Sequence, residues 1–115
     1  MATKTLGGRK LGVTGSHRRA LLRNMATSLF LHEKVETTVA KAKELRPFAE
    51  KIITSAKKGR HDLVRRHIQD KVVYRKLFEV LSPRYAQRLG GYTRIVRLVP
   101  RIGDNAKRGL ISLVS

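Results

Sequence analysis

The sequence has no cysteine and few acidic residues, with 8 Asp and Glu against 26 Lys and Arg in 115 residues. The absence of cysteine excludes disulfides, thiolate metal sites, iron–sulfur clusters and cysteine nucleophiles. The shortage of acidic residues leaves a formal charge of +18, which destabilises a compact chain through self-repulsion unless a polyanion neutralises it. The composition therefore indicates an extended anionic partner.

Long apolar runs are also missing. The longest nearly apolar stretch covers about five residues, 110–114, and Ser112 interrupts it, whereas a membrane-spanning helix needs roughly 20. Residues 1–10 contain no apolar block of the kind found in secretory signals. We therefore expect a chain that does not cross a membrane, and its length favours a single folded domain.

The few acidic residues lie in the middle of the chain. None precedes Glu33, and Asp104 is the only one after Glu79. Mixed charge in the middle is typical of solvated helix faces with partly paired side chains. The unpaired cations at both ends gain nothing locally, so they are better explained by contact with phosphates.

The first 15 residues contain four glycines and little apolar periodicity, which is typical of an extended arm. We expect this basic arm over 1–15 and one globular domain over 16–115. From Ser16, which can cap a helix, apolar residues recur every three or four positions up to Leu29, while Arg19 and Arg23 form another strip. This pattern predicts an amphipathic helix with a basic face.

Short β-branched segments and further helices follow. An extended segment is expected over 34–39, then a helix from about Ala40 that Pro47 kinks and Gly59 ends. Residues 92–99 and 110–114 have the composition of strands. We predict an α+β fold in which several helices pack on a small mixed sheet of about three strands. Two acidic residues and a Ser-Pro pair are expected to start further short helices: Asp62, Asp70 and Ser82-Pro83.

The sequence offers no convincing catalytic or metal site. Ser16 and His17 are adjacent on a helix start, so their side chains diverge by about 100°, and an N-cap with a phosphate-facing imidazole is favoured. His61 and His67 lack the spacing of zinc ligands, and no glycine-rich phosphate loop occurs. We expect no enzymatic activity, no cofactor and no metal. Three glutamates beside lysines and arginines are expected to form intrahelical ion pairs instead: Glu36, Glu44 and Glu50.

Several features favour RNA as the partner, namely the cationic arm, the basic helix face, a loop over 100–103, and Tyr92 beside Arg94 and Arg97. Glycines in the arm allow the backbone to approach the sugar–phosphate chain. Tyr92 is either a core residue of a strand or a platform for base stacking, and the core is favoured. Aromatic residues make up only 5% of the chain, which argues against a protein that reads single-stranded sequence.

Motifs along nearly the whole chain resemble a known family. They are GRKLG at 8–12, SHRRALLRNMATSLF at 16–30, HEKVETT at 32–38, AKAKELRP at 40–47, LFE at 77–79, PRY at 83–85 and GGYTRI at 90–95. In this order they are similar to the bacterial large-subunit ribosomal protein family numbered seventeen. The resemblance implies an α+β structural protein with an N-terminal extension and without catalytic activity.

The resemblance also implies partners and a location. Such a protein binds large-subunit ribosomal RNA near the rim of the peptide exit tunnel, beside other large-subunit proteins and without a membrane or small-molecule substrate. The expected location is the ribosome of the bacterial cytoplasm, with a mitochondrial or plastid ribosome as the alternative. The positions that match the motifs are the expected RNA contacts: Arg9, Lys10, His17, Arg18, Arg19, Arg23, Asn24, Arg94 and Arg101.

Two other functions are compatible with the charge alone. A nucleoid or DNA-architectural protein would carry the same excess of cations, and a competition between duplex DNA and structured ribosomal RNA distinguishes it. A membrane-surface helix over 16–31 would need several interfacial aromatic residues, but Phe30 is the only one there.

Overall fold

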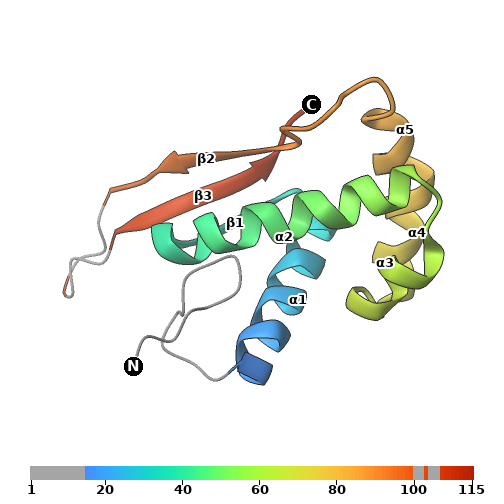
Figure 1. The fold of residues 1–115 in the computed structure, drawn as a ribbon. Helices are drawn as coiled ribbons and strands as arrows, with labels where there is room; N and C mark the ends of the chain where they lie inside the picture. Colours follow the sequence, from blue (N-terminus) through green and yellow to red (C-terminus); the bar gives the residue numbers. More distant parts are fainter. Residues whose placement is uncertain (1–14, 100–102, 104–106) are drawn as a thin grey trace.

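The computed structural model describes residues 15–99, 103 and 107–115 (Figure 1). The predicted arm over 1–15 therefore lies outside the described residues, apart from Gly15. The chain forms an α+β fold, as expected. Its elements, in order, are α1 (Gly15–His32), β1 (Lys34–Thr38), α2 (Val39–Lys57), α3 (His61–His67), α4 (Lys71–Lys76), the π-helical turn η1 (Leu77–Leu81), α5 (Ser82–Arg84), β2 (Thr93–Arg97) and β3 (Arg108–Leu113).

The three strands form one sheet in the order β1-β3-β2. Both neighbouring pairs are antiparallel, with Val35 opposite Ile111 and Ile95 opposite the same residue. The prediction of a mixed sheet was therefore wrong in this detail. β1 and β2 do run in the same direction, but β3 lies between them, so the two parallel strands never pair.

The predicted periodicity of the two long helices is confirmed. α1 buries Leu22, Ala26, Leu29 and Phe30 on one face. α2 begins after Thr38, whose hydroxyl accepts a hydrogen bond from the Lys41 amide at 3.2 Å, and it continues as one helix through Pro47. It ends at the predicted glycine, because Gly59 adopts a φ of 72°, the left-handed conformation that closes many helices.

The turn between α1 and β1 depends on Glu33. This residue has a φ of 67°, in the left-handed region that side chains other than glycine rarely adopt. Its amide donates to the Leu29 carbonyl at 2.7 Å, and its own carbonyl accepts from the Leu113 amide at 2.9 Å. Glu33 thus ends α1 and fixes the start of β1 against β3.

The shorter helices follow the prediction only in part. Asp70 caps α4 as expected, since its carboxylate accepts from the amides of Val72 and Val73 at 2.9 and 3.1 Å. Asp62 lies inside the first turn of α3, whose N-cap is Arg60 without a side-chain bond. Ser82 is helical and does not cap α5, because the backbone enters α5 directly from η1.

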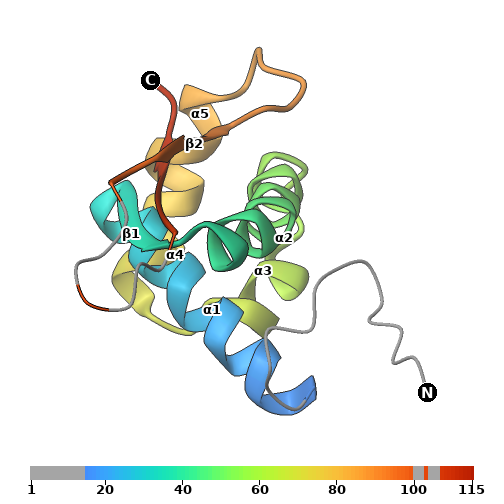
Figure 2. The same cartoon turned by 90° about the vertical axis from the view of Figure 1, so that its left-hand side faces the viewer.

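One hydrophobic cluster joins the helices to the sheet. The inward face of β3, with Gly109, Ile111 and Leu113, is buried, and a Cβ on Gly109 would lie 3.4 Å from the Val39 side chain of α2. Figure 2 shows α1 and α2 on the same side of the sheet. The opposite face of the sheet carries no helix of the described chain.

Candidate nucleic-acid interface

The N-terminal half of α1 presents polar side chains to solvent. His17, Arg19 and Asn24 are exposed. His17 and Asn24 lie opposite the buried stripe that begins at Leu22, whereas Arg19 lies about one turn before the stripe on the same side. Three of the expected RNA contacts are therefore exposed on α1, and two of them, His17 and Asn24, share one side of the helix. Arg9, Lys10 and Arg101 are outside the described residues.

Arg18 is oriented differently from its neighbour Arg19. Its guanidinium forms an ion pair with Glu44 of α2, and the two side chains are only 16% and 7% exposed. The prediction that Glu44 forms an intrahelical pair was therefore wrong, since the pair joins two helices. A buried carboxylate needs a counter-charge, so Arg18 stabilises the packing of α1 on α2.

Arg23 lies between the exposed and the buried side of α1. Its Nε is buried without a hydrogen-bond partner in the described part of the protein. Burial lowers the pKa of His67 in α3, and the nearby charges of Arg23 and Arg66 lower it further. The ring of His67 contacts Phe48 edge-on, with 5.1 Å between centroids. A protonated His67 is thus disfavoured at this junction.

The other two glutamates also differ from the prediction. Glu36 pairs across the sheet with Arg108 of β3, so it is not intrahelical. Glu50 does form the expected pair with Arg46 one turn earlier, with 3.6 Å between Nε and Oε2, and it also accepts a hydrogen bond from the Thr93 hydroxyl at 2.9 Å. These carboxylates tie the helices and strands together.

The helix-free face of the sheet carries Arg94. In the register, Lys34 of β1, Ser112 of β3 and Arg94 of β2 form one row, and side chains in a row point to the same face. Arg94 is exposed and shares a polar hollow of about 290 Å³ with Arg88. Two guanidinium groups beside serine hydroxyls are suited to a phosphate.

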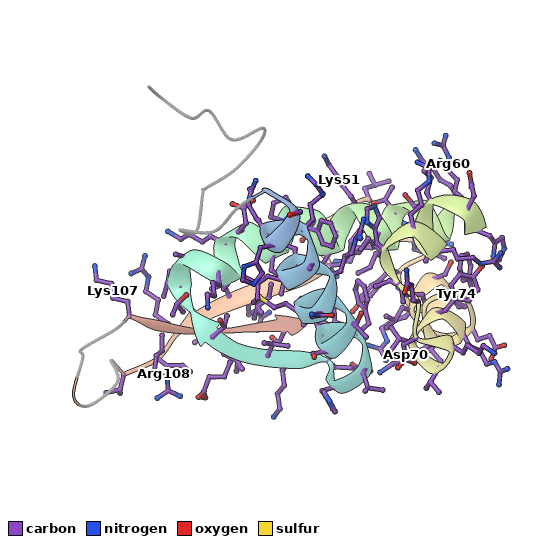
Figure 3. The ribbon with its side chains drawn as sticks, turned by 90° about the horizontal axis from the view of Figure 1, so that it is seen from below. Lys51, Arg60, Asp70, Tyr74, Lys107 and Arg108 are labelled. Atoms are coloured by element: carbon purple, nitrogen blue, oxygen red, sulfur yellow. The ribbon has the colours of Figure 1, made fainter. Side chains whose placement is uncertain are left out.

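Sequence reasoning missed Arg88, because the irregular connection 85–92 gives no periodicity from which its position could be predicted. It also missed a second basic hollow of about 360 Å³, which Lys43, Arg97 and Lys107 line. The Val39 amide donates to the Lys107 carbonyl at 3.0 Å, which brings the β2–β3 hairpin against the start of α2. Lys107 and Arg108 lie at one end of the molecule in Figure 3.

Tyr92 is a core residue, as the favoured interpretation stated. Its ring is 1% exposed and lies 5.1 Å from the ring of Tyr85. The Lys57 ammonium donates to its hydroxyl at 2.9 Å. Since both faces of the ring are enclosed, Tyr92 is not a platform for base stacking.

Within residues 15–99, 103 and 107–115, no three His, Asp or Glu side chains gather in a way that could hold a metal ion. The helices there are too short or too polar to span a bilayer. The surface described so far carries two basic hollows and exposed basic and polar side chains on α1. They are suited to holding phosphates.

Comparison with known proteins identifies the family. A family model described as ribosomal protein L17 matches residues 21–114. The chain is 59% identical over 111 residues to the large ribosomal subunit protein bL17 of Elusimicrobium minutum, covering 96% of this chain and 97% of that protein. The chain belongs to the ribosomal protein L17 family. As a member, it is a structural component of the ribosome and not an enzyme.

Further relatives agree with this assignment. The bL17 proteins of Halothermothrix orenii and Endomicrobium trichonymphae are 52% and 47% identical to the chain. The first alignment covers 92% of this chain and 96% of the relative, and the second covers 97% and 98%. The resemblance stated from the sequence motifs is thereby confirmed, and the L17 family match extends from α1 to the end of β3.

Proposed function

We propose that the chain is a structural constituent of the large ribosomal subunit that binds and stabilises folded ribosomal RNA near the rim of the peptide exit tunnel, beside other large-subunit proteins. Membership of the L17 family carries this proposal. The relatives come from bacteria, so the location we propose is the ribosome of the bacterial cytoplasm. A mitochondrial or plastid ribosome is the alternative.

The contacts we propose on the described residues are exposed donor side chains that form no ion pair with a described carboxylate. Arg19 and Asn24 on α1 and Arg94 beside Arg88 offer donors to phosphate oxygens, and such contacts position a protein on RNA without reading its sequence. Arg18 has a different role, because its charge is already neutralised by Glu44. The remaining proposed contacts from the sequence are Arg9, Lys10, His17, Arg23 and Arg101.

Sedimentation tests the assignment to the large subunit. A tagged chain expressed in its own cells should sediment with large subunits through a moderate-salt wash, because many phosphate contacts break only at higher ionic strength. A free pool with no ribosomal association would contradict the proposal.

Salt dependence of RNA binding tests the individual contacts. Replacing Arg19 and Arg94 by glutamine should flatten the slope of log affinity against log salt by about 0.7 to 0.9 per lost phosphate contact. Arg46→Gln serves as the charge-matched control, since Arg46 is exposed on α2, pairs with Glu50 at 3.6 Å and is not among the proposed contacts, so the slope should stay unchanged. If the slope of log affinity against log salt is the same for all three variants and the wild type, Arg19 of α1 and Arg94 of β2 do not contact phosphates.

The competing assignment is a DNA-architectural protein. Structured large-subunit ribosomal RNA should displace bound duplex DNA at equal phosphate concentration, since the proposed arm and hollows fit folded RNA. Displacement in the opposite direction would favour DNA.

A further inference from the structure

A separate hollow lies at the end of the molecule formed by α3, α4 and η1. Its volume is about 620 Å³, and His61, Arg65, Tyr74, Arg75 and Phe78 are among its lining residues. Figure 3 shows Tyr74 and Arg60 at the end opposite Lys107 and Arg108. The hollow is therefore distant from the basic hollow at the β2–β3 hairpin. Its volume is in the range of small-molecule sites.

Three aromatic rings form the floor of this hollow. His61 stacks on Phe78 with 4.0 Å between ring centroids and 14° between ring planes, and Tyr74 is tilted against Phe78 at 5.0 Å. The Tyr74 hydroxyl lies 2.6 Å from Nδ1 of His61, which holds the imidazole in place. His61 is exposed, whereas Tyr74 and Phe78 are half-buried. The ring that a ligand can reach is thus the one at the outer end of a stack.

Cations surround the rings. The Arg65 guanidinium lies 5.3 Å from the centroid of Tyr74, and Lys71 and Arg75 line the same hollow and are exposed. None of the three forms an ion pair with a carboxylate of the described chain, although Glu79 also lines the hollow. Three cations against one carboxylate leave the hollow complementary to an anion.

We propose that this hollow binds a single unpaired nucleotide of RNA, with its base stacked on His61 and its phosphate held by Arg65, Lys71 or Arg75. Proteins bind unstacked RNA bases on aromatic rings and guanidinium planes, and any base can occupy such a platform because each has a π-face. A base on His61 would extend the existing stack over Phe78. This site is additional to the phosphate contacts of α1 and the sheet.

The combination of rings and cations favours a nucleotide over the other occupants of an apolar hollow. An apolar side chain from a neighbouring protein would fill the ring-lined floor but would leave three cations without a counter-charge. An RNA duplex would meet the cations but cannot present a base face to the rings, since its bases are stacked inside. Only an extruded or single-stranded nucleotide uses both features.

Binding of a mononucleotide to the purified full-length chain tests the site. Adenosine 5′-monophosphate should shift the aromatic NMR signals of His61, Tyr74 and Phe78, while ribose 5-phosphate, which has no base, should leave them in place. His61→Ala should weaken the affinity by about fivefold or more, as expected when a stacking ring is lost. Because His61 is exposed, the variant should fold like the wild type, and circular dichroism checks this.

Two neighbouring arginines provide the matched pair of variants. Arg65 lines the hollow and Arg66 does not, although both belong to α3 and are exposed. Arg65→Ala should weaken nucleotide binding, and Arg66→Ala should leave it unchanged. Equal losses in the two variants, or equal shifts with ribose 5-phosphate, would overturn the proposal because binding would then depend on general charge alone.

The assembled subunit provides the second test. Short-wavelength irradiation of intact large subunits should attach a nucleotide to a peptide within residues 61–78, and His61→Ala should abolish this adduct while the protein still sediments with the subunit. An adduct on α1 with none on this peptide would overturn the nucleotide site without affecting the proposed function. A chemical crosslink from this peptide to another protein instead would assign the hollow to a protein partner.

Discussion

The carboxylates behave differently in two regions of the molecule. Between residues 33 and 50, Glu33, Glu36, Glu44 and Glu50 form five ion pairs with described cations, and only the Arg46–Glu50 pair lies within one helix. In α3, α4 and η1, neither Asp62 nor Glu79 pairs with a described cation, and Asp70 accepts from backbone amides. The carboxylates of the first region therefore hold the fold through cations drawn from several elements, including Lys76 of α4. Arg65, Lys71 and Arg75 of the second region form no ion pair with a described carboxylate, so they are left to a ligand.

The difference shows that formal charge alone does not locate a binding surface. Arg18 and Arg19 are adjacent and carry the same side chain, but of the two only Arg18 forms an ion pair with a described carboxylate, that of Glu44. A cation that neutralises a buried glutamate contributes to stability, and one without a partner is available to a phosphate. The comparison predicts that carboxylate substitutions lose stability in proportion to how deeply the pair is buried.

The largest loss is expected for Glu44→Gln. Removing one member of a buried pair leaves the other charge uncompensated, so the free energy of unfolding should fall by about 3 kcal/mol. Urea denaturation measures the change. The double replacement of Arg18 and Glu44 by methionine should recover most of the stability, since no buried charge remains. A loss below about 1 kcal/mol in the single variant would make this pair equivalent to a surface pair.

Glu33→Gln should have an intermediate effect that depends on pH. The bidentate hydrogen bonds from Arg84, at 2.8 and 3.0 Å, and the nearby Lys76 lower the pKa of Glu33 from 4.5 to about 2. A depressed folded-state pKa stabilises the protein above the usual pKa, and this contribution is lost as the pH falls from 4.5 toward about 2. Because the side chain is 36% exposed, the loss at neutral pH should be about 1 kcal/mol.

Thermal unfolding of both proteins across the acid range checks the Glu33 prediction. The stability difference between wild type and Glu33→Gln should narrow as the carboxylate is protonated. Glutamine keeps the size of the side chain at this left-handed position, so backbone strain is matched between the two. A difference that stays constant down to the lowest pH would contradict the role of the charge.

Glu36→Gln should have a smaller effect. Its pair with Arg108 is half-exposed, with 51% of the Glu36 side chain accessible, so a loss of about 0.5 kcal/mol is expected at low salt. The loss should disappear in about 1 M salt, where exposed charges are screened. Denaturation at low and high salt measures the loss in the free energy of unfolding. A loss that persists at high salt would show that the Glu36 side chain acts through packing and not through its charge.

Glu79→Gln should have the smallest effect on stability. The carboxylate is exposed and forms no ion pair with a described residue, so the change should stay within about 0.5 kcal/mol. The same variant should bind adenosine 5′-monophosphate more tightly, because it removes the carboxylate that lines the hollow. Weaker nucleotide binding in this variant would contradict the charge argument for that site.

Local signals in the sequence were sufficient for the helices and their ends. The apolar spacing of α1, the cap formed by Asp70 and the left-handed Gly59 depend on residues within one or two turns, so the chain reveals them directly. The three strand segments were predicted on the same basis. Their order and direction were not, because they depend on how the helices between β1 and β2 return the chain to the sheet and on how the connection after β2 places β3 between the other two strands.

Contacts between residues far apart in the sequence could not be predicted from the spacing of residue types along the chain. Arg18 and Glu44 are 26 positions apart, and nothing in the motif around Arg18 shows that it faces inward while Arg19 does not. The nucleotide hollow is similar, since Tyr74 and Phe78 are one helical turn apart but His61 reaches them from another helix. No pattern predicts the π-helical turn over Leu77–Leu81.

The position of β3 at the centre of the sheet has a consequence for synthesis of the chain. β1 and β2 each pair only with β3, and β3 is the last of the three to leave the ribosome that makes it. Chains fold from the N-terminus as they emerge, so α1 and α2 can pack while β1 still has no partner. The sheet forms only after residues 108–113 emerge, and until then β1 and β2 lack the strand whose backbone hydrogen bonds join them.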